Sequence, residues 1–226
     1  NTGTFRKTGS ATTNVASVFN NVSPGVVDVQ AGTLNLSNGG TQTGDFVTAA
    51  GAILRFNGGT FNINTLSVSS LRVSTTVNVL GTLTVGGLLE LLTSGTLNVT
   101  GQVNADSYSQ NAGGTLSGTG SLAVSGQATW TSGTMTGTGT TIFNGTATIT
   151  ANGNVQFLGG GRKLNTAGTT TFTGANGDFR TGASETINNS GVWIDETTGT
   201  SRIGNVFGGS FDQSPFNNTG TFRKTG

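Results

Sequence analysis

The residues with the clearest potential for chemistry lie in the last quarter of this 226-residue sequence. Glu185, Asp195 and Glu196 are carboxylates of the kind that cleave glycosidic bonds, a reaction that needs two such groups in one groove. Arg180 and Arg202 complete the set. The simpler alternative is ion pairing between neighbouring turns of the chain, worth ~0 to 1 kcal/mol for each surface pair. We favour ion pairing and predict that the chain is not an enzyme and has no catalytic residue.

Metal and cofactor chemistry has few candidate groups in this sequence. There is no histidine and no cysteine, which removes the commonest metal ligands, the usual general base and any thiol or disulfide chemistry. Gly177-Asp178 and Asp195-Glu196 could contribute to a calcium site, which needs several converging oxygens. The Gly-Thr-Gly triplets at 118–120 and 137–139 lack the Gly-Lys-Ser/Thr that follows a phosphate-binding loop. We therefore expect no bound metal and no cofactor.

The composition indicates what kind of scaffold carries these residues. Gly, Thr, Asn and Ser make up more than half of the sequence, which excludes an ordinary helical domain. Leu, Ile, Val and Phe together make up about a quarter of it, enough for a thin core and too much for a disordered chain. The sequence therefore predicts short strands and turns around a narrow interior.

Alternating apolar and polar residues predict strands with one dry and one wet face at 76–85, 95–99 and 147–150. In the first of these, Val77, Val79, Leu83 and Val85 form the predicted core side. A Gly-Thr-apolar motif recurs at Gly32, Gly59, Gly81, Gly95, Gly114 and Gly133. Repeats of about 20 to 25 residues built from strands and turns are typical of solenoids. We predict an all-β fold, a right-handed parallel β-helix of about nine to ten coils.

A longer repeat is visible at the two ends, where residues 1–9 recur without change as residues 218–226, an offset of 217. We interpret residues 1–217 as one β-solenoid unit and residues 218–226 as the start of the next identical unit. The chain would then be an internal piece or a matured chain. Residues 1–217 hold eight basic and nine acidic side chains, a charge of −1, so the basic pI gives no support for nucleic-acid binding.

Asparagine marks a second repeat family, with an apolar-Asn-polar-small-Gly pattern at 164–168, 187–191 and 216–220. Phe19-Asn20-Asn21 begins the same pattern and, counted across the longer repeat, is the next copy after the one that starts at Phe216. We expect these asparagines to sit in left-handed turns at coil corners, with amides bonded from coil to coil.

Threonine has two interpretations in this sequence. An outward, flat threonine array could order water at an ice surface or present hydroxyls to a glycan. The threonine pairs, such as those at 136 and 138 or 146 and 148, show no constant spacing between coils. We therefore expect no regular array and assign threonine a structural role on strands.

The segments at 27–36, 130–139 and 216–226 resemble long repetitive surface proteins of bacteria. They are similar to filamentous-haemagglutinin-like proteins and to autotransporter-associated β-strand repeat proteins. The resemblance implies a secreted or surface-anchored β-solenoid that serves as adhesin stalk, biofilm-matrix fibre or sheath. Its expected partners are neighbouring identical units and cell-surface or matrix polysaccharide. The alternative is a glycan-binding or glycan-cleaving β-helix protein. No apolar run reaches the ~20 residues of a membrane helix, so we expect no membrane span. The Arg-Lys pairs at 6–7, 162–163 and 223–224 are isolated among neutral residues, so we expect no nucleic-acid partner.

Overall fold

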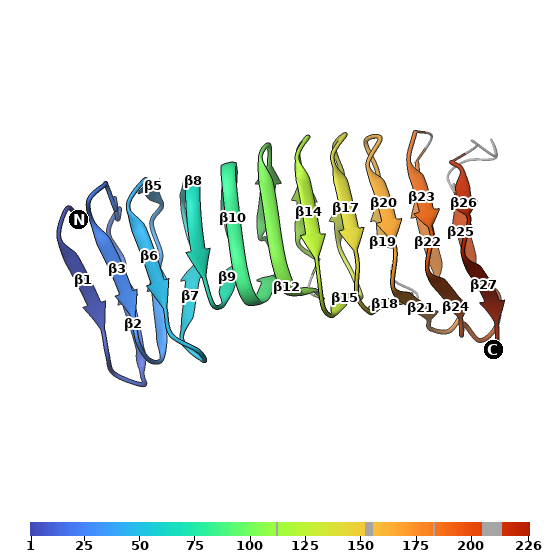
Figure 1. Cartoon of the computed structure of the whole chain (residues 1–226), viewed down its shortest axis with the longest axis horizontal. Coiled ribbons are helices and arrows are strands. Elements are labelled where there is room, and N and C mark those ends of the chain that lie inside the picture. Colours follow the sequence, from blue (N-terminus) through green and yellow to red (C-terminus); the bar gives the residue numbers. More distant parts are fainter. Residues whose placement is uncertain (112, 152–155, 183, 205–213) are drawn as a thin grey trace.

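The computed structural model of the chain is an elongated rod of stacked coils, with the two termini at opposite ends (Figure 1). It describes residues 1–111, 113–151, 156–182, 184–204 and 214–226. The described residues form 27 strands and no helix. Strands of neighbouring coils pair in parallel, and the chain makes about ten turns. The predicted all-β, parallel β-helix fold is therefore confirmed.

Each coil contributes strands to three parallel ladders, which we call faces 1, 2 and 3, and the chain visits them in that order. Face 1 consists of β1 (Thr4–Lys7), β3 (Val26–Val29), β6 (Asp45–Thr48), the second half of β8 (Thr60–Val68), the middle of β10 (Thr76–Leu91), the first half of β12 (Gln102–Gln110), β14 (Ser121–Val124), β17 (Thr140–Phe143), β20 (Lys163–Thr166), β23 (Thr186–Asn189) and β26 (Phe216–Asn218).

Face 2 consists of β2 (Thr12–Val15), β4 (Thr33–Leu36), β7 (Ile53–Phe56), β9 (Leu71–Val73), the ends of β10 and β12, β15 (Ala128–Trp130), β18 (Ala147–Thr150), β21 (Thr169–Thr173), β24 (Val192–Asp195) and β27 (Thr221–Lys224). Face 3 consists of β5 (Gly40–Gln42), the starts of β8 and β10, β11 (Thr96–Val99), β13 (Thr115–Ser117), β16 (Thr134–Met135), β19 (Gln156–Leu158), β22 (Asp178–Thr181) and β25 (Arg202–Gly204).

The coils differ in length, because corners absorb insertions without changing the ladder. The shortest coil leads from Asn62 to Asn78, a sequence separation of 16, and the longest leads from Asn188 to Asn217, a separation of 29. The Gly-Thr-apolar motif consequently opens strands on different faces: Gly32 precedes face 2, Gly81 precedes face 1, and Gly95 precedes face 3. The motif marks the start of a strand rather than a fixed position in the coil.

Alternation places one side of every strand in a dry interior. The predicted core residues Val77, Val79, Leu83 and Val85 are all at most 1% exposed, which confirms the assigned side of that strand. The interior is filled mainly by Val, Leu, Ile and Phe, and also holds both tryptophans, Trp130 and Trp193. Burial of this apolar column along the whole rod is the main stabilising term of the fold.

Among the described strands, the ladders are interrupted at one place, on face 1 between β6 and β8. β6 pairs with β3, and the second half of β8 pairs with β10, but β6 and β8 do not pair. The corner before this face is one residue shorter in β8, which has Asn64 alone, than in the preceding coil, which has Thr43 and Gly44. The β10 side has the same one-residue difference, and there a bulge keeps the strands paired.

Candidate functional site

The structure does not bring the three predicted carboxylates together. Glu185 is buried at the corner between faces 3 and 1, where it accepts hydrogen bonds from the backbone N–H groups of Gly161 (2.9 Å) and Ser184 (3.1 Å). Asp195 ends β24 on face 2, and Glu196 is exposed at the following corner. A glycosidase pair built from these residues is therefore not formed in the structure.

The expected ion pairing between coils occurs at one of these groups, with a partner outside the predicted set. Asp195 Oδ1 lies 3.6 Å from Lys224 Nζ of the next coil and also accepts from the Thr197 hydroxyl at 2.6 Å. Arg180 lies on face 3 and is 3.8 Å from Asp178 of its own strand. Arg202 is exposed on the neighbouring strand of that face.

The candidate calcium ligands are also divided between faces. Asp178 lies on face 3, whereas Asp195 lies on face 2 and Glu196 at the corner that follows it. No group of three or more acidic side chains able to hold a metal ion occurs in the described part of the chain. No helix of the described residues is long and apolar enough to cross a membrane.

The structure instead reveals an open groove on face 1. A hollow of about 550 Å³ lies between β6 and β8, and a second of about 340 Å³ lies over β10, β12 and β14. Thr84 and Gly86 line both hollows, so the two are adjacent along the rod. Hollows of this size can hold small ligands.

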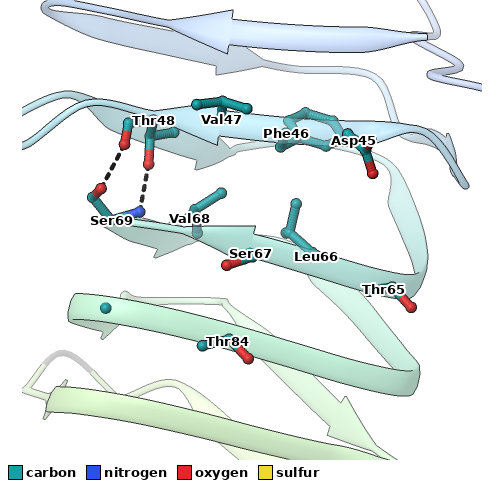
Figure 2. Close-up of a pocket in the computed structure, with 11 residues that line it drawn as sticks. Asp45, Phe46, Val47, Thr48, Thr65, Leu66, Ser67, Val68, Ser69 and Thr84 are labelled. Carbon is teal, nitrogen blue, oxygen red and sulfur yellow. Dashed lines mark hydrogen bonds between the residues drawn. The ribbon is translucent and has the colours of Figure 1, made fainter. Parts of the chain in front are cut away.

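The unpaired strands β6 and β8 flank the larger hollow of this groove (Figure 2). At one end of the gap the Ser69 hydroxyl donates to the Thr48 carbonyl at 2.5 Å, and the Ser69 N–H donates to the Thr48 hydroxyl. Asp45 stands at the other end, and the exposed Val47 lies between them. The two side-chain contacts replace a backbone ladder along the gap.

Apolar and polar groups both line the groove, and the polar groups are mostly uncharged. Hydroxyl and amide side chains come from Thr65, Ser67, Thr84, Asn104, Ser125 and Asn144. Exposed Asp45 and Asp106 add one carboxylate to each hollow, and the described lining contains no basic side chain. Sequence reasoning missed this groove, because its lining combines outward positions of successive coils with the inward residues Phe46, Leu66 and Val68 beside the gap, and these residues form no motif.

A polar cluster is buried inside the rod. The Arg162 side chain is fully buried, and it donates from Nε to the Thr141 hydroxyl (2.9 Å) and from Nη1 to the carbonyls of Thr136 (2.9 Å) and Gly118 (3.4 Å). Its Nη2 has no hydrogen-bond partner in the described part of the chain. Burial lowers the pKa of Arg162 to about 10, partly offset by the proximity of Tyr108. Arg162 therefore ties three coils together from within.

Tyr108 lies in the same interior and is fully buried. Its hydroxyl donates to Gln110 Oε1 at 2.7 Å, and Gln110 Nε2 donates to the Gly114 carbonyl at 2.7 Å. Burial raises the pKa of Tyr108 well above its ordinary value, although the Arg162 charge opposes the shift. Both groups serve the interior, because neither reaches the surface.

Threonine forms a regular outward column on face 3, contrary to the expectation from sequence. Thr60, Thr76, Thr96, Thr115 and Thr134 pair with one another across five coils, although the intervals between them in the sequence are unequal. The unequal corner lengths conceal this register in the sequence. A parallel column holds an asparagine ladder, with Asn78 Nδ2 donating to Asn62 Oδ1 (2.8 Å) and Asn98 Nδ2 to Asn78 Oδ1 (3.1 Å).

A second asparagine ladder runs along face 1. Asn188 Nδ2 donates to Asn165 Oδ1 (2.8 Å), and Asn217 Nδ2 donates to Asn188 Oδ1 (2.9 Å). The bonding from coil to coil agrees with the prediction, but its predicted location at left-handed corners is wrong. These residues lie within β20, β23 and β26, and none of them has a positive φ. Extended backbone points alternate amides outward, where they stack directly.

The two ends of the rod present strands that are paired on one edge only. At one end β1 pairs with β3 and β2 with β4; at the other, β26 pairs with β23 and β27 with β24. Phe222 of β27 continues the inward column of Trp193 and is 47% exposed. Each end therefore offers backbone hydrogen-bonding groups and apolar surface to a further coil.

Comparison with protein-family models, with curated proteins and with solved structures finds no match to this chain.

Proposed function

We propose that this chain is a structural and adhesive segment of an extracellular fibre, in which solenoid units continue end to end. In this proposal the chain is of the same type as the repetitive bacterial surface proteins that it resembles, and it has no catalytic role. Its partners are identical neighbouring units and, at the surface, polysaccharide of the cell or matrix.

One observation carries this proposal: the same nine residues form an outermost strand at each end of the rod. The first copy provides β1, which pairs with the coil that follows it, and the second copy provides β27, which pairs with the coil before it. A single strand of this sequence is therefore able to join two units, one on each edge. Solenoid coils contact only their neighbours, so such a junction extends the rod without altering its interior.

A chain with two units tests this proposal: residues 1–217 followed by residues 1–226. Coils are ~4.8 Å apart, so negative-stain images should show rods about 50 Å long for the single unit and about 100 Å long for the double unit. The double unit should also unfold at a higher denaturant concentration, because one exposed end is replaced by an interface. Two separate particles joined by a flexible link would overturn the proposal.

A second candidate function is glycan binding in the groove of face 1, and the lining of that groove favours it. Hydroxyl, amide and carboxylate groups arranged along the rod axis can bond the hydroxyls of a neutral sugar chain, and the absence of basic groups from the described lining disfavours polyanions. Calorimetric titration with neutral oligosaccharides tests this idea. Asp106→Asn should weaken binding at least fivefold, whereas Glu90→Gln on face 2 should leave it unchanged. Equal binding by the two variants would exclude this groove.

A further inference from the structure

We infer that successive units in the fibre are turned by one face relative to each other, because each unit advances by ten and one-third turns. This inference rests on the proposed function and specifies its interface. The junction would place face 1 of one unit in line with face 2 of the unit before it. A second copy of this chain is thus the partner, in one defined register.

The first support is the placement of the two nonapeptide copies. Face 1 carries eleven strand segments from β1 to β26, so ten complete turns separate these strands, and β27 lies one face further, on face 2. The first copy therefore lies on face 1 and the second on face 2. Inward residues are the same in both: Phe5 pairs with the buried Val27, and Phe222 pairs with the buried Trp193.

The second support comes from an amide that both copies use, in Asn1 and its equivalent Asn218. Asn1 Nδ2 donates to Asn21 Oδ1 of the following coil at 2.9 Å. Asn218 Oδ1 accepts from Asn189 Nδ2 of the preceding coil at 2.7 Å. When the two copies are superimposed, one amide accepts from the coil before it and donates to the coil after it. The junction then contains a continuous ladder of Asn189, Asn218 and Asn21 of the following unit.

The third support comes mainly from residues outside the nonapeptide. Asn165, Asn188 and Asn217 form the outward ladder of face 1, in which each Nδ2 donates to the preceding Oδ1. In this unit Phe19-Asn20-Asn21 lies on face 3, bonded to the chain of β5. A turn of one face moves the next unit's copy onto face 1, directly over Phe216-Asn217-Asn218. The like residues then stack, and the next unit's Asn20 extends the ladder from Asn217.

The charge at the junction also fits this register. Arg6 Nε lies 2.9 Å from Asp28 Oδ2 in the following coil. Its equivalent, Arg223, lies outward on the free edge of β27. The next unit's Asp28 would meet Arg223 there. A consequence is that the groove of face 1 recurs on a different side in each unit and returns to its first side after three units.

Introduced thiols test the register in the two-unit chain, since the natural sequence has no cysteine. Asn217→Cys in the first unit and Asn20→Cys in the second are exposed positions that the inference makes neighbours across two strands. Cα atoms in such neighbours are ~5 Å apart, within the range of a disulfide. Under mild oxidation this pair should form a disulfide to the same extent as the control pair Asn188→Cys with Asn217→Cys.

The opposite result is equally well defined. Without the turn, Asn20 of the second unit would lie on face 3, in the column of Thr41, Asn62 and Asn78, out of reach of Asn217 on face 1, and this pair would stay reduced while the control pair oxidises. That outcome in a rod of double length would overturn the register and leave the fibre proposal standing. A two-unit chain that forms no rod would overturn both. Image reconstruction of a longer unsubstituted array gives a second measurement, with ~50 Å rise and about 120° of rotation per unit expected from the coil spacing.

Discussion

Lys7 and Lys224 hold the same position in the two copies of the nonapeptide and make the same contact. Each ammonium group donates to the carbonyl two residues beyond its strand partner: Lys7 pairs with Val29 and bonds Ala31 O at 3.2 Å, and Lys224 pairs with Asp195 and bonds Thr197 O at 2.7 Å. The nonapeptide thus brings its own corner contact to either end of the rod. The two lysines differ in burial: Lys7 is 6% exposed, whereas the Lys224 side chain is 47% exposed.

This difference gives a prediction for the single unit. Lys7→Ala removes the charge-assisted hydrogen bonds to Gly9 O and Ala31 O and a buried side-chain stem, so it should lower the free energy of unfolding by about 1 to 2 kcal/mol. Lys224→Ala, at a side chain 47% exposed, should lower it by less than about 1 kcal/mol. Urea denaturation followed by circular dichroism measures both values. Equal losses would show that the end coils do not differ in this way.

A second prediction concerns the interior. Val79 has no exposed surface, so Val79→Asp places an unpaired charge in a dry core and should abolish folding of the unit. Leu80, the next residue, is 54% exposed at a corner, and Leu80→Asp should change stability by less than about 0.5 kcal/mol. Far-ultraviolet circular dichroism and thermal melting compare the two variants. If the Val79→Asp protein melted like the parent, the assignment of Val79 to the core side of β10 would be wrong.

Titration of Tyr108, the sole tyrosine in the sequence, gives a third prediction. Its raised pKa means that the folded protein keeps the phenol protonated at pH 11, whereas the unfolded chain ionises near pH 10. The folded state then binds more protons, so Tyr108 makes stability fall as pH rises above about 10. Absorbance at 295 nm should therefore show tyrosinate only on unfolding. Ionisation near pH 10 with unchanged circular dichroism would contradict the buried hydrogen bond to Gln110.

The buried arginine gives a fourth prediction. Arg162→Met leaves the Thr141 hydroxyl and two carbonyls without their donor, so it should lower the free energy of unfolding by about 2 to 4 kcal/mol. The neighbouring Lys163 is exposed, and Lys163→Met should cost less than about 0.5 kcal/mol. Denaturant titration of the pair checks the result. Similar stabilities would mean that Arg162 does not tie the coils together.

The interrupted ladder gives a fifth prediction. Backbone amides of β6 and the second half of β8 that face the gap lack strand partners, so they should exchange with deuterium at least tenfold faster than amides between β10 and β12. Thr48→Val removes the hydroxyl that accepts from Ser69 and should raise exchange in this region further. Thr82→Val, on an exposed side chain of the same face, is the matched control. Uniform protection along face 1 would show that the ladder is closed.

The sequence by itself determined the strand class, the stacking of coils and the inward side of residues 76–85. These properties follow from local rules, because alternation selects the buried side and Gly, Asn and Ser turns bound each strand. The coil-to-coil bonding of Asn165, Asn188 and Asn217 was also predictable, since like residues recur at roughly one coil, but its location within strands was not. The strands within each coil could therefore be located without knowing which face each would join.

Only the tertiary structure decided which residues share a face. Corners absorb a variable number of residues, so stacked positions are separated by anything from 16 to 29 in the sequence, and equal spacing does not mean equal position. The lengths of the corners decide three features: the threonine column of face 3, the groove between β6 and β8, and the separation of Glu185 from Asp195. The summed corner lengths also place one nonapeptide on face 1 and its copy on face 2, because the chain between the copies does not make a whole number of turns.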